Sequence, residues 1–339
     1  MTHARIARQI PPRFALDVDF PIGPGVTAIY GPAGAGKTLI LESIAGFIRP
    51  DSGRILLDDV ILFDAESRVH VPPRRRNIGC VFQRDSLFPH LTLRQNLMFA
   101  AKRFPRLDRH RRVAEMLDRL HLAGAAASRP REIAPAERLR GEIARALIGE
   151  PKLLLLDDRA IGEALLREIR VVPILLVTHD LDLCCAAADE LLILDAGRIV
   201  QRGAPRQVLE HPASLEAARL IGIPNLFEGV IAALDPGRDS SRLEFGPFAL
   251  TGPYLPGHFR GDRVWVAVRS EDLRVHPGDI EPQINFISLP LVRISQRARS
   301  ARLEFSGGVF ADLSREEFDR QKDNKEWQVE FPPGALRIL

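Results

Sequence analysis

The sequence is poor in the features that mark secreted and membrane-spanning proteins. It has three cysteines in 339 residues, and the adjacent pair Cys184 and Cys185 must face opposite sides of any regular element. We therefore expect no disulfide framework, and a reducing compartment fits best. Apolar runs stay below the ~18 residues that a membrane-spanning helix needs. The N-terminal region carries Arg5 and Arg8 but lacks the apolar segment of a signal peptide.

An excess of one charge is also missing. The formal net charge of +3 does not imply general nucleic-acid binding, and no nucleic-acid partner is expected. Two local basic runs, residues 74–76 and 102–112, are interpreted as solvated faces. The 45% apolar and 27% charged content is that of an ordinary soluble protein, and the length suggests two or three domains.

What the sequence does contain is a phosphate-binding pattern near its N-terminus. Residues 31–38 read Gly-Pro-Ala-Gly-Ala-Gly-Lys-Thr and fit G-x-x-x-x-G-K-[ST]. The stretch 26–30 predicts a buried strand before it, and 39–46 predict a helix closed by glycine after it. Backbone amides would point at the anion, Lys37 would hold the outer phosphates and Thr38 would bind Mg²⁺. The residues expected to contact the nucleotide are Gly31, Pro32, Ala33, Gly34, Ala35, Gly36, Lys37, Thr38 and Leu39.

Further polar residues lie at the ends of three predicted strands, 78–82, 153–158 and 174–179. An open α/β sheet places its ligand groups at the carboxyl ends of its strands. Asp157 is therefore expected to reach the water shell of the magnesium ion that Thr38 binds. Gln83 joins Thr38 and Asp157 as a candidate metal-binding residue, and it can report whether metal and γ-phosphate are present. His179 can donate to the γ-phosphate or to the attacking water.

The strand predicted at 14–20 begins with an aromatic residue. Phe14 is a candidate platform for stacking a purine, while a core or edge phenylalanine is an equally good interpretation. Between Gln83 and Asp157 the pattern becomes helical, and we expect a helical subdomain at about 87–147.

The C-terminal third contains an internal repeat. Arg242-Leu243-Glu244-Phe245 recurs sixty positions later as Arg302-Leu303-Glu304-Phe305, Asn225 recurs as Asn285, and the segment at Trp265 recurs at Trp327. Short strands broken by proline and glycine predict an all-β domain. We therefore divide the chain into 1–222 and 223–339, the latter built from two repeats at about 225–280 and 285–339.

With these motifs in place, the chain resembles the ATP-binding subunit of an ABC importer. The resemblance implies an α/β P-loop NTPase of the ABC ATPase type with a helical subdomain, followed by a small all-β domain that is OB-like or TOBE-like. Lys37 and Thr38 match the Walker A positions, Gln83 the Q-loop, Asp157 Walker B and His179 the switch histidine. The sequence of residues 72–91 looks most like that of molybdate importer subunits, although sulfate, iron(III), polyamine and sugar importers share much of it.

The resemblance also implies partners. ATP and Mg²⁺ would be the cofactors, and two ATPase subunits, identical or different, would act on membrane permease subunits. The protein would then be cytoplasmic and peripheral on the inner face of the plasma membrane. The helical region would dock on the permease through Phe88 and Leu91, and the β domain could bind a small oxyanion, with Arg269 and Ser270 as weak candidate contacts.

Three departures from the family pattern bear on hydrolysis. Where the family has Leu-Ser-Gly-Gly-Gln, residues 133–137 read Ile-Ala-Pro-Ala-Glu, which removes a hydroxyl and an N–H that grip the nucleotide of the other subunit. Asp158 stands where the family has the glutamate that activates water, one methylene shorter. Residues 159–162 do not resemble the family's cross-dimer segment, and the stretch from 158 to 179 is too short for the usual loop and helix.

Two hypotheses therefore stay open. The first is a transport-coupled ATPase with Asp158, His179 and Gln83 as catalytic residues. The second is a hydrolysis-deficient, nucleotide-binding paralogue that serves as a regulatory or heterodimer partner. A P-loop enzyme unrelated to transport is disfavoured, because it gives no reason for the helical insert and the β appendage.

Overall fold

The computed structural model describes residues 2–12, 14–83, 86–157, 161–245, 248–278, 284–297, 300–321, 324 and 326–339. The chain divides into two compact units, residues 1–208 and 209–339. This division falls within α7 (Pro205–Glu210), before the boundary after residue 222 that the sequence analysis placed. Among the described residues, no helix combines the length and the apolar character needed to cross a membrane.

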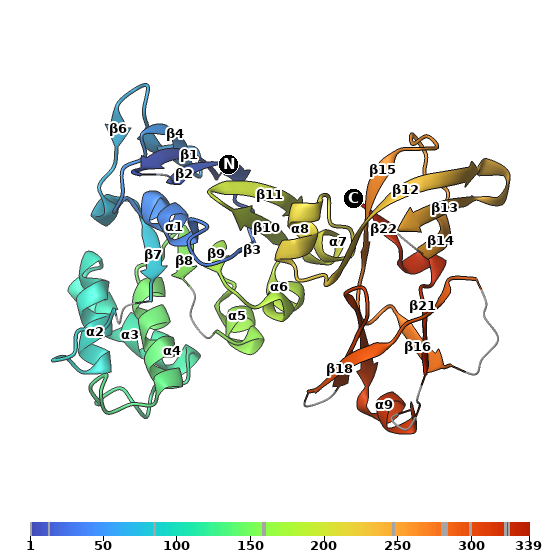
Figure 1. Cartoon of the computed structure of the whole chain (residues 1–339). Helices are drawn as coiled ribbons and strands as arrows, with labels where there is room; N and C mark the ends of the chain where they lie inside the picture. The colour runs from blue at the N-terminus through green and yellow to red at the C-terminus, as the bar shows by residue number, and fades with distance from the viewer. Residues whose placement is uncertain are drawn as a thin grey trace. The chain divides into compact units, whose positions relative to one another are not determined.

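The first unit is built around a six-stranded sheet with the order β11-β10-β3-β9-β8-β7 (Figure 1). The strands are β3 (Val26–Tyr30), β7 (Ile78–Val81), β8 (Leu153–Asp157), β9 (Ile174–Val177), β10 (Glu190–Asp195) and β11 (Arg198–Gly203). All neighbouring pairs are parallel except β10 with β11. Five parallel strands, β3, β7, β8, β9 and β10, therefore end at the same edge of the sheet.

Side chains on alternating sides of these strands form two separate cores. In β8, Leu154 and Leu156 join one core and Leu153 and Leu155 join the other, because successive residues of a strand face opposite sides. A continuous leucine run is what a parallel strand buried on both faces requires. The first core is shared with α2 (Leu93–Ala100), α3 (Arg106–Arg119), α4 (Pro135–Leu147), α5 (Glu163–Ile169) and α6 (Leu181–Ala187).

The second core of this unit lies between the same sheet, helix α1 (Lys37–Ala45) and an antiparallel sheet. That sheet has the order β2-β1-β4-β5-β6. Its strands are β1 (His3–Ile10), β2 (Phe14–Pro21), β4 (Ser52–Leu57), β5 (Val60–Asp64) and β6 (Val69–His70), and the 3₁₀ turn η1 (Pro73–Arg75) leads from β6 into β7. Helix α1 thus has its apolar residues enclosed by β structure, which fixes where its N-terminus points.

The second unit is mostly β structure in three small antiparallel sheets. The first contains β12 (Asn225–Asp235), β13 (Ser240–Phe245), β14 (Phe248–Pro253), β15 (Arg263–Val268) and β22 (Arg337–Ile338). The others contain β16 (Arg274–Pro277), β17 (Phe286–Ser288) and β21 (Trp327–Glu330), and β18 (Leu291–Gln296), β19 (Ser300–Phe305) and β20 (Val309–Ser314). Helices α8 (Leu215–Leu220) and α9 (Arg315–Gln321) complete the unit. The predicted fold class, an α/β domain followed by an all-β domain, is confirmed.

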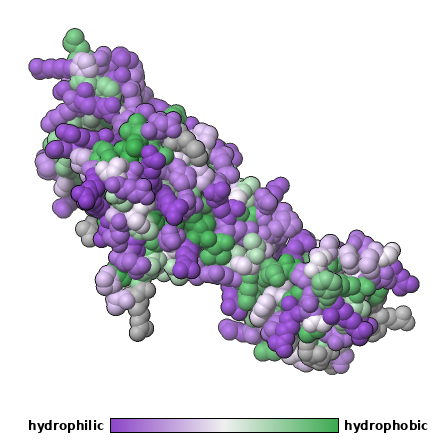
Figure 2. All heavy atoms as spheres, turned by 90° about the horizontal axis from the view of Figure 1, so that it is seen from above, coloured by the Kyte–Doolittle hydropathy of each residue, from purple (hydrophilic) through white to green (hydrophobic). Residues whose placement is uncertain are grey.

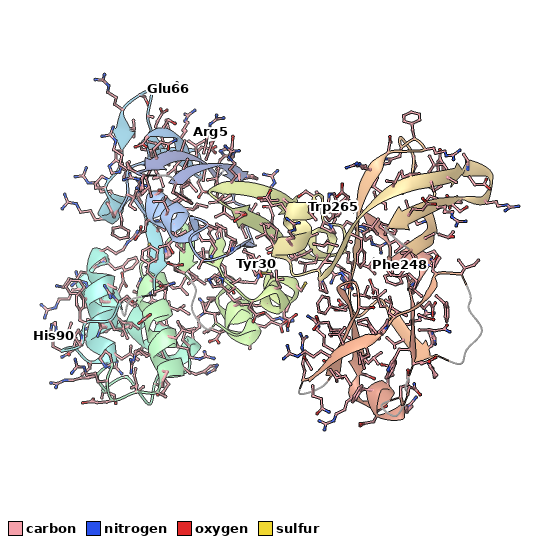
Figure 3. All side chains as sticks on the ribbon, in the orientation of Figure 1. Arg5, Tyr30, Glu66, His90, Phe248 and Trp265 are labelled. Atoms are coloured by element: carbon pink, nitrogen blue, oxygen red, sulfur yellow. The ribbon has the colours of Figure 1, made fainter. Side chains whose placement is uncertain are left out.

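The sequence repeat corresponds to a repeat of strands. The two Arg-Leu-Glu-Phe segments end β13 and β19, and the two tryptophans lie in β15 and β21. The copies exchange strands, because β15 pairs with β22 of the second copy and β21 pairs with β16 of the first. Side chains of both copies form one common core. Figure 3 labels Phe248 on β14 and Trp265 on β15, both from the first copy.

Two buried asparagines join the copies. Asn225 donates to the Phe310 carbonyl at 2.8 Å and accepts from the Phe310 N–H at 2.7 Å. Asn285 makes the corresponding pair with Thr251, at 2.7 and 2.6 Å, and also donates to the Phe331 carbonyl. Each side-chain amide therefore replaces a missing backbone partner in the other copy, which explains why asparagine recurs at this position.

We predict that Asn225→Ala destabilises the second unit, because it leaves the N–H and carbonyl of Phe310 buried without a partner. The expected cost is about 1–3 kcal/mol for each unsatisfied group. Both tryptophans of the chain lie in this unit, so urea unfolding followed by tryptophan fluorescence reports on it selectively. Gln296→Ala, at an exposed position of β18, is the matched control and should leave the midpoint unchanged. An unchanged midpoint for Asn225→Ala would contradict the role given to this residue.

Candidate functional site

The carboxyl-terminal edge of the parallel sheet holds a cavity of about 370 Å³. It is lined by Ala33, Gly34, Gly36, Lys37, Thr38, Leu39, Gln83, Asp157, Val177 and His179. These residues come from the loop after β3 and the first turn of α1, from the segment after β7, from the end of β8 and from the end of β9 and the residues after it. Tyr30, labelled in Figure 3, is the last residue of β3 before this loop. The structure therefore brings together five polar side chains that are separated by up to 142 positions in the sequence, from Lys37 to His179.

The loop at residues 31–36 turns directly into helix α1. Gly36 is the N-cap residue with φ of 104°, a left-handed conformation that a residue with a side chain adopts only under strain. A Cβ atom there would lie 2.9 Å from Cζ of Phe14, so the ring of Phe14 lies against this glycine. The backbone N–H groups of the first turn of α1 lack intrahelical acceptors and suit an anion. Phe14 is thus next to the loop, and its role in stacking a base stays a prediction.

Lys37 and Thr38 both donate hydrogen bonds, Lys37 to backbone carbonyls and Thr38 to a carboxylate. Lys37 is buried, and its Nζ donates to the carbonyls of Gly31 and Pro32 at 2.8 Å each. The Thr38 hydroxyl donates to Oδ2 of Asp157 at 3.1 Å. Asp157 is only 1% exposed, so its carboxylate is held on the hydroxyl that the sequence assigns to magnesium. One ammonium group and one carboxylate thus line the cavity at the start of α1.

A second carboxylate, Glu42, lies one turn beyond Thr38 on α1, and the sequence analysis missed it. Burial raises the pKa of Glu42, and the charge of Asp157 raises it further. A divalent cation beside Asp157 would oppose this shift, since it favours the charged carboxylate. The sequence did contain a signal for Glu42. It lies four residues after Thr38 on a predicted helix, and residues four apart share a helix face.

The protein groups alone make an incomplete metal site. In the described ranges, no cluster of three or more His, Cys, Asp or Glu side chains is arranged to hold a metal ion. The hydroxyl of Thr38 and the carboxylate of Asp157 supply hard oxygen donors, which suit Mg²⁺. Magnesium commonly takes its remaining ligands from water and from substrate phosphates. These residues fit a magnesium ion that arrives with a triphosphate.

Gln83 and His179 both line the cavity from exposed positions that follow buried strands. Asp180, the residue after His179, caps α6 by accepting from the Leu183 N–H at 2.9 Å, as its position predicts. The positions of Gln83 and His179 match those expected for groups that reach a γ-phosphate, and their catalytic roles stay predictions. Asp158 and residues 159–160 lie outside the described part of the chain.

The helix that would carry the family signature begins with its own cap. Helix α4 starts at Pro135, and Glu137 Oε2 accepts the N–H of Ala134 at 3.1 Å. A carboxylate therefore occupies the positive end of this helix, where the resemblance implies a phosphate from another subunit. The stretch from 158 to 179, which the sequence analysis found too short for the usual loop and helix, contains helix α5 of seven residues.

The structure speaks against Ser270 and Arg269 as anion contacts in the second unit. The buried Ser270 hydroxyl donates to Asp312 Oδ2 at 2.8 Å, and this carboxylate is also held by Arg302 at 2.6 Å. Arg269 pairs with Glu271. Burial tends to raise the pKa of Asp312, but hydrogen bonds from Arg302 and Ser270 outweigh it and lower the pKa. The ionised carboxylate therefore keeps the Ser270 hydroxyl engaged.

We predict that Asp157→Asn selectively weakens the magnesium dependence of ATP binding. The amide keeps an oxygen for the Thr38 hydroxyl but loses the charge that attracts the cation. The affinity for Mg²⁺ in the presence of ATP should fall at least about tenfold, the usual scale for groups that support a metal site. ATP affinity in EDTA should be unchanged or slightly higher. Calorimetric titration measures both, with the exposed Glu66→Gln as control, and equal losses with and without Mg²⁺ would refute this role.

Comparison with known proteins agrees with the geometry. The family described as "ABC transporter" matches residues 16–160. The molybdenum import ATP-binding protein ModC of Paramagnetospirillum magneticum is 35% identical over 79% of this chain and 75% of its own length. The molybdate/tungstate import protein WtpC of Archaeoglobus fulgidus is 37% identical over 66% and 95%, and the spermidine/putrescine import protein PotA of Oleidesulfovibrio alaskensis is 35% identical over 73% and 68%.

Solved structures show the same fold. The subunit cbiO1 of the Clostridium perfringens ABC transporter complex cbiONQ superimposes with a TM-score of 0.52 at 24% identity, over 61% of this chain and 89% of its own. Another ATP-binding subunit of an ABC transporter gives a TM-score of 0.53 over 63% and 95%. On the strength of its curated relatives and of the site at the sheet edge, the chain belongs to the ATP-binding subunits of ABC transporters of the importer type.

Proposed function

We propose that this subunit couples the binding and hydrolysis of Mg·ATP to the import of a small oxyanion such as molybdate. The observation that carries the proposal is the single cavity that joins Lys37 and Thr38 to Gln83, Asp157 and His179. In this proposal the five side chains share four tasks toward a metal-bound triphosphate. Lys37 neutralises charge, Thr38 and Asp157 hold the metal, Gln83 senses it and His179 donates a proton. The catalytic residues in this proposal are Asp158, His179 and Gln83.

The substrate class is inferred from relatives. Proteins named for molybdenum or molybdate import match at 35–37% identity, and proteins named for spermidine and putrescine import match at 35–36%. We propose the oxyanion because the sequence of residues 72–91 looks most like that of molybdate importer subunits. The polyamine is the competing substrate, and it differs in the sign of its charge.

We propose that the helical region 87–147 docks on the permease and so holds the subunit at the cytoplasmic face of the membrane. Asn96 organises its first turn by donating to the carbonyls of Phe88 and Leu91 at 3.2 Å each, and by accepting from the Phe88 N–H at 2.7 Å. Phe88 meets Phe99 edge-on, with ring centroids 4.9 Å apart, and Phe99 is 43% exposed. Phe88 is half-buried and Phe99 is exposed, and the turn that holds Phe88 follows Gln83 by five positions in the sequence. This arrangement suits a partner that must sense the nucleotide.

A second candidate function is a nucleotide-binding partner that hydrolyses little. The capped N-terminus of α4 favours it, since Glu137 competes there with any phosphate from another subunit. Ala134 adds no hydroxyl and Pro135 no N–H. A heterodimer with an intact subunit would then retain one full composite site.

We predict that the chain restores uptake of radiolabelled molybdate in a bacterial host that lacks its own ATPase subunit of this system. Spermidine uptake in a matched polyamine-transport mutant should not be restored. The Lys37→Ala variant should restore neither, because the outer phosphates lose their counter-charge. Restored spermidine uptake without molybdate uptake would overturn the proposed substrate.

Single-turnover hydrolysis of purified protein separates the two candidate functions. If the chain is a transport-coupled ATPase, its rate of hydrolysis of bound ATP should be well above the rate of the Lys37→Ala variant. A rate no higher than that of the variant, together with intact ATP binding, would instead support the hydrolysis-deficient partner.

We predict that the double substitution Phe88→Asp and Leu91→Asp abolishes co-purification with the permease. Two charges on the docking surface would have to be desolvated on association. Val60→Asp on β5 is the control, because Val60 is a 54% exposed apolar residue that lies outside the helical region 87–147. Persistent co-purification of the double variant would rule out this surface.

A further inference from the structure

Arg76 is a buried arginine at the opposite end of helix α1 from the phosphate loop. The sequence analysis interpreted residues 74–76 as a solvated face, and this is wrong for the last of them. Arg74 and Arg75 are exposed, whereas Arg76 is 1% exposed and ranks among the largest fully buried side chains. Its guanidinium donates to the carbonyls of Ser43 at 2.8 Å, Ile44 at 2.7 Å and Val71 at 2.7 Å.

These contacts cap the C-terminus of α1. The last carbonyls of a helix have no intrahelical donor and carry the negative end of the helix dipole. Gly46 ends the helix in the left-handed conformation, with φ of 87°, and a Cβ atom there would lie 2.4 Å from Nε of Arg76. The helix end is therefore shaped around the guanidinium, and only glycine leaves room for it.

The charge of Arg76 is compensated by dipoles. Among the described residues, no carboxylate forms an ion pair with it, and its Nη2 atom has no hydrogen-bond partner. Burial lowers the pKa of Arg76 to about 10, which still leaves the group cationic at neutral pH. A cation that is buried without a counter-ion is costly, so its presence here calls for a reason beyond packing.

The position of Arg76 in the chain supplies such a reason. It lies between η1 and β7, and β7 ends at Val81, directly before Phe82 and Gln83. On the other side of the contact, Phe47 follows Gly46 and meets Phe82 edge-on, with ring centroids 5.8 Å apart. Arg76 and Phe47 thus connect the end of the phosphate-loop helix to the segment formed by β7 and the two residues after it, which include Gln83.

We propose that Arg76 is a positioning residue that fixes α1 against β7, so that the phosphate loop and Gln83 engage the same metal-bound triphosphate. This inference rests on the proposed function. The loop and Lys37 lie at the N-terminus of α1 and hold phosphate by local contacts. Gln83 arrives from another strand, so its distance to the metal depends on how α1 and β7 are joined.

The test compares Arg76→Gln and Arg76→Lys with Arg75→Gln, an exposed neighbour of the same charge, in the full chain. ATP affinity is measured by calorimetry in EDTA and with Mg²⁺. For Arg76→Gln we expect the ATP affinity in EDTA to stay within about twofold of wild type. The factor by which Mg²⁺ increases ATP affinity, called here the Mg²⁺ enhancement, should fall about tenfold. Arg76→Lys should recover only part of this enhancement, because an ammonium group lacks the fork that reaches three carbonyls. Arg75→Gln should change neither value.

Phe47→Ala provides a second variant that does not disturb the buried cation. Phe47 is 61% exposed, so the substitution should fold even if the Arg76 variants do not. It should reproduce the selective loss of Mg²⁺ enhancement. Parallel losses with and without Mg²⁺, or wild-type enhancement in Phe47→Ala, would overturn the positioning role. Wild-type protein that fails to bind ATP at all would instead remove the proposed function itself.

Discussion

The buried carboxylate of Asp157, held against the hydroxyl of Thr38, is the contact on which the site depends. It joins the end of β8 to the start of α1, two elements 119 positions apart in the chain. A carboxylate that is 1% exposed needs a partner, and in this fold the partner is also a magnesium ligand candidate. The parallel order of the sheet then places Gln83 and His179 at the same edge.

The surroundings of α1 explain how this contact is kept in place. The helix is enclosed by two sheets, its N-terminus opens into the cavity, and its C-terminus is closed by the Arg76 guanidinium. Positive groups therefore serve both ends of one short helix: Lys37 near the phosphates and Arg76 at the last carbonyls. The second unit is held together differently, since its two copies exchange strands and share a core.

Most of the surface visible in Figure 2 is hydrophilic, with small scattered apolar areas.

Much of this could be predicted from the sequence because the signals are local. Three segments each predict the element in which they lie: the loop at 31–38, the leucine run of β8 and the repeated Arg-Leu-Glu-Phe segments. The polar groups at strand ends then follow from the rule for parallel sheets. Glu42, Arg76 and the strand exchange between the copies were missed, because each depends on which elements pack together. A basic triplet such as residues 74–76 gives no local sign that its third member turns inward onto a helix end.

The most direct test of the central claim is an equilibrium titration of the purified chain with ATP in the presence of Mg²⁺. The account predicts saturable binding at submillimolar ATP, abolished when Lys37 is replaced by alanine. The absence of binding at millimolar ATP, or equal binding by wild type and Lys37→Ala, would contradict it.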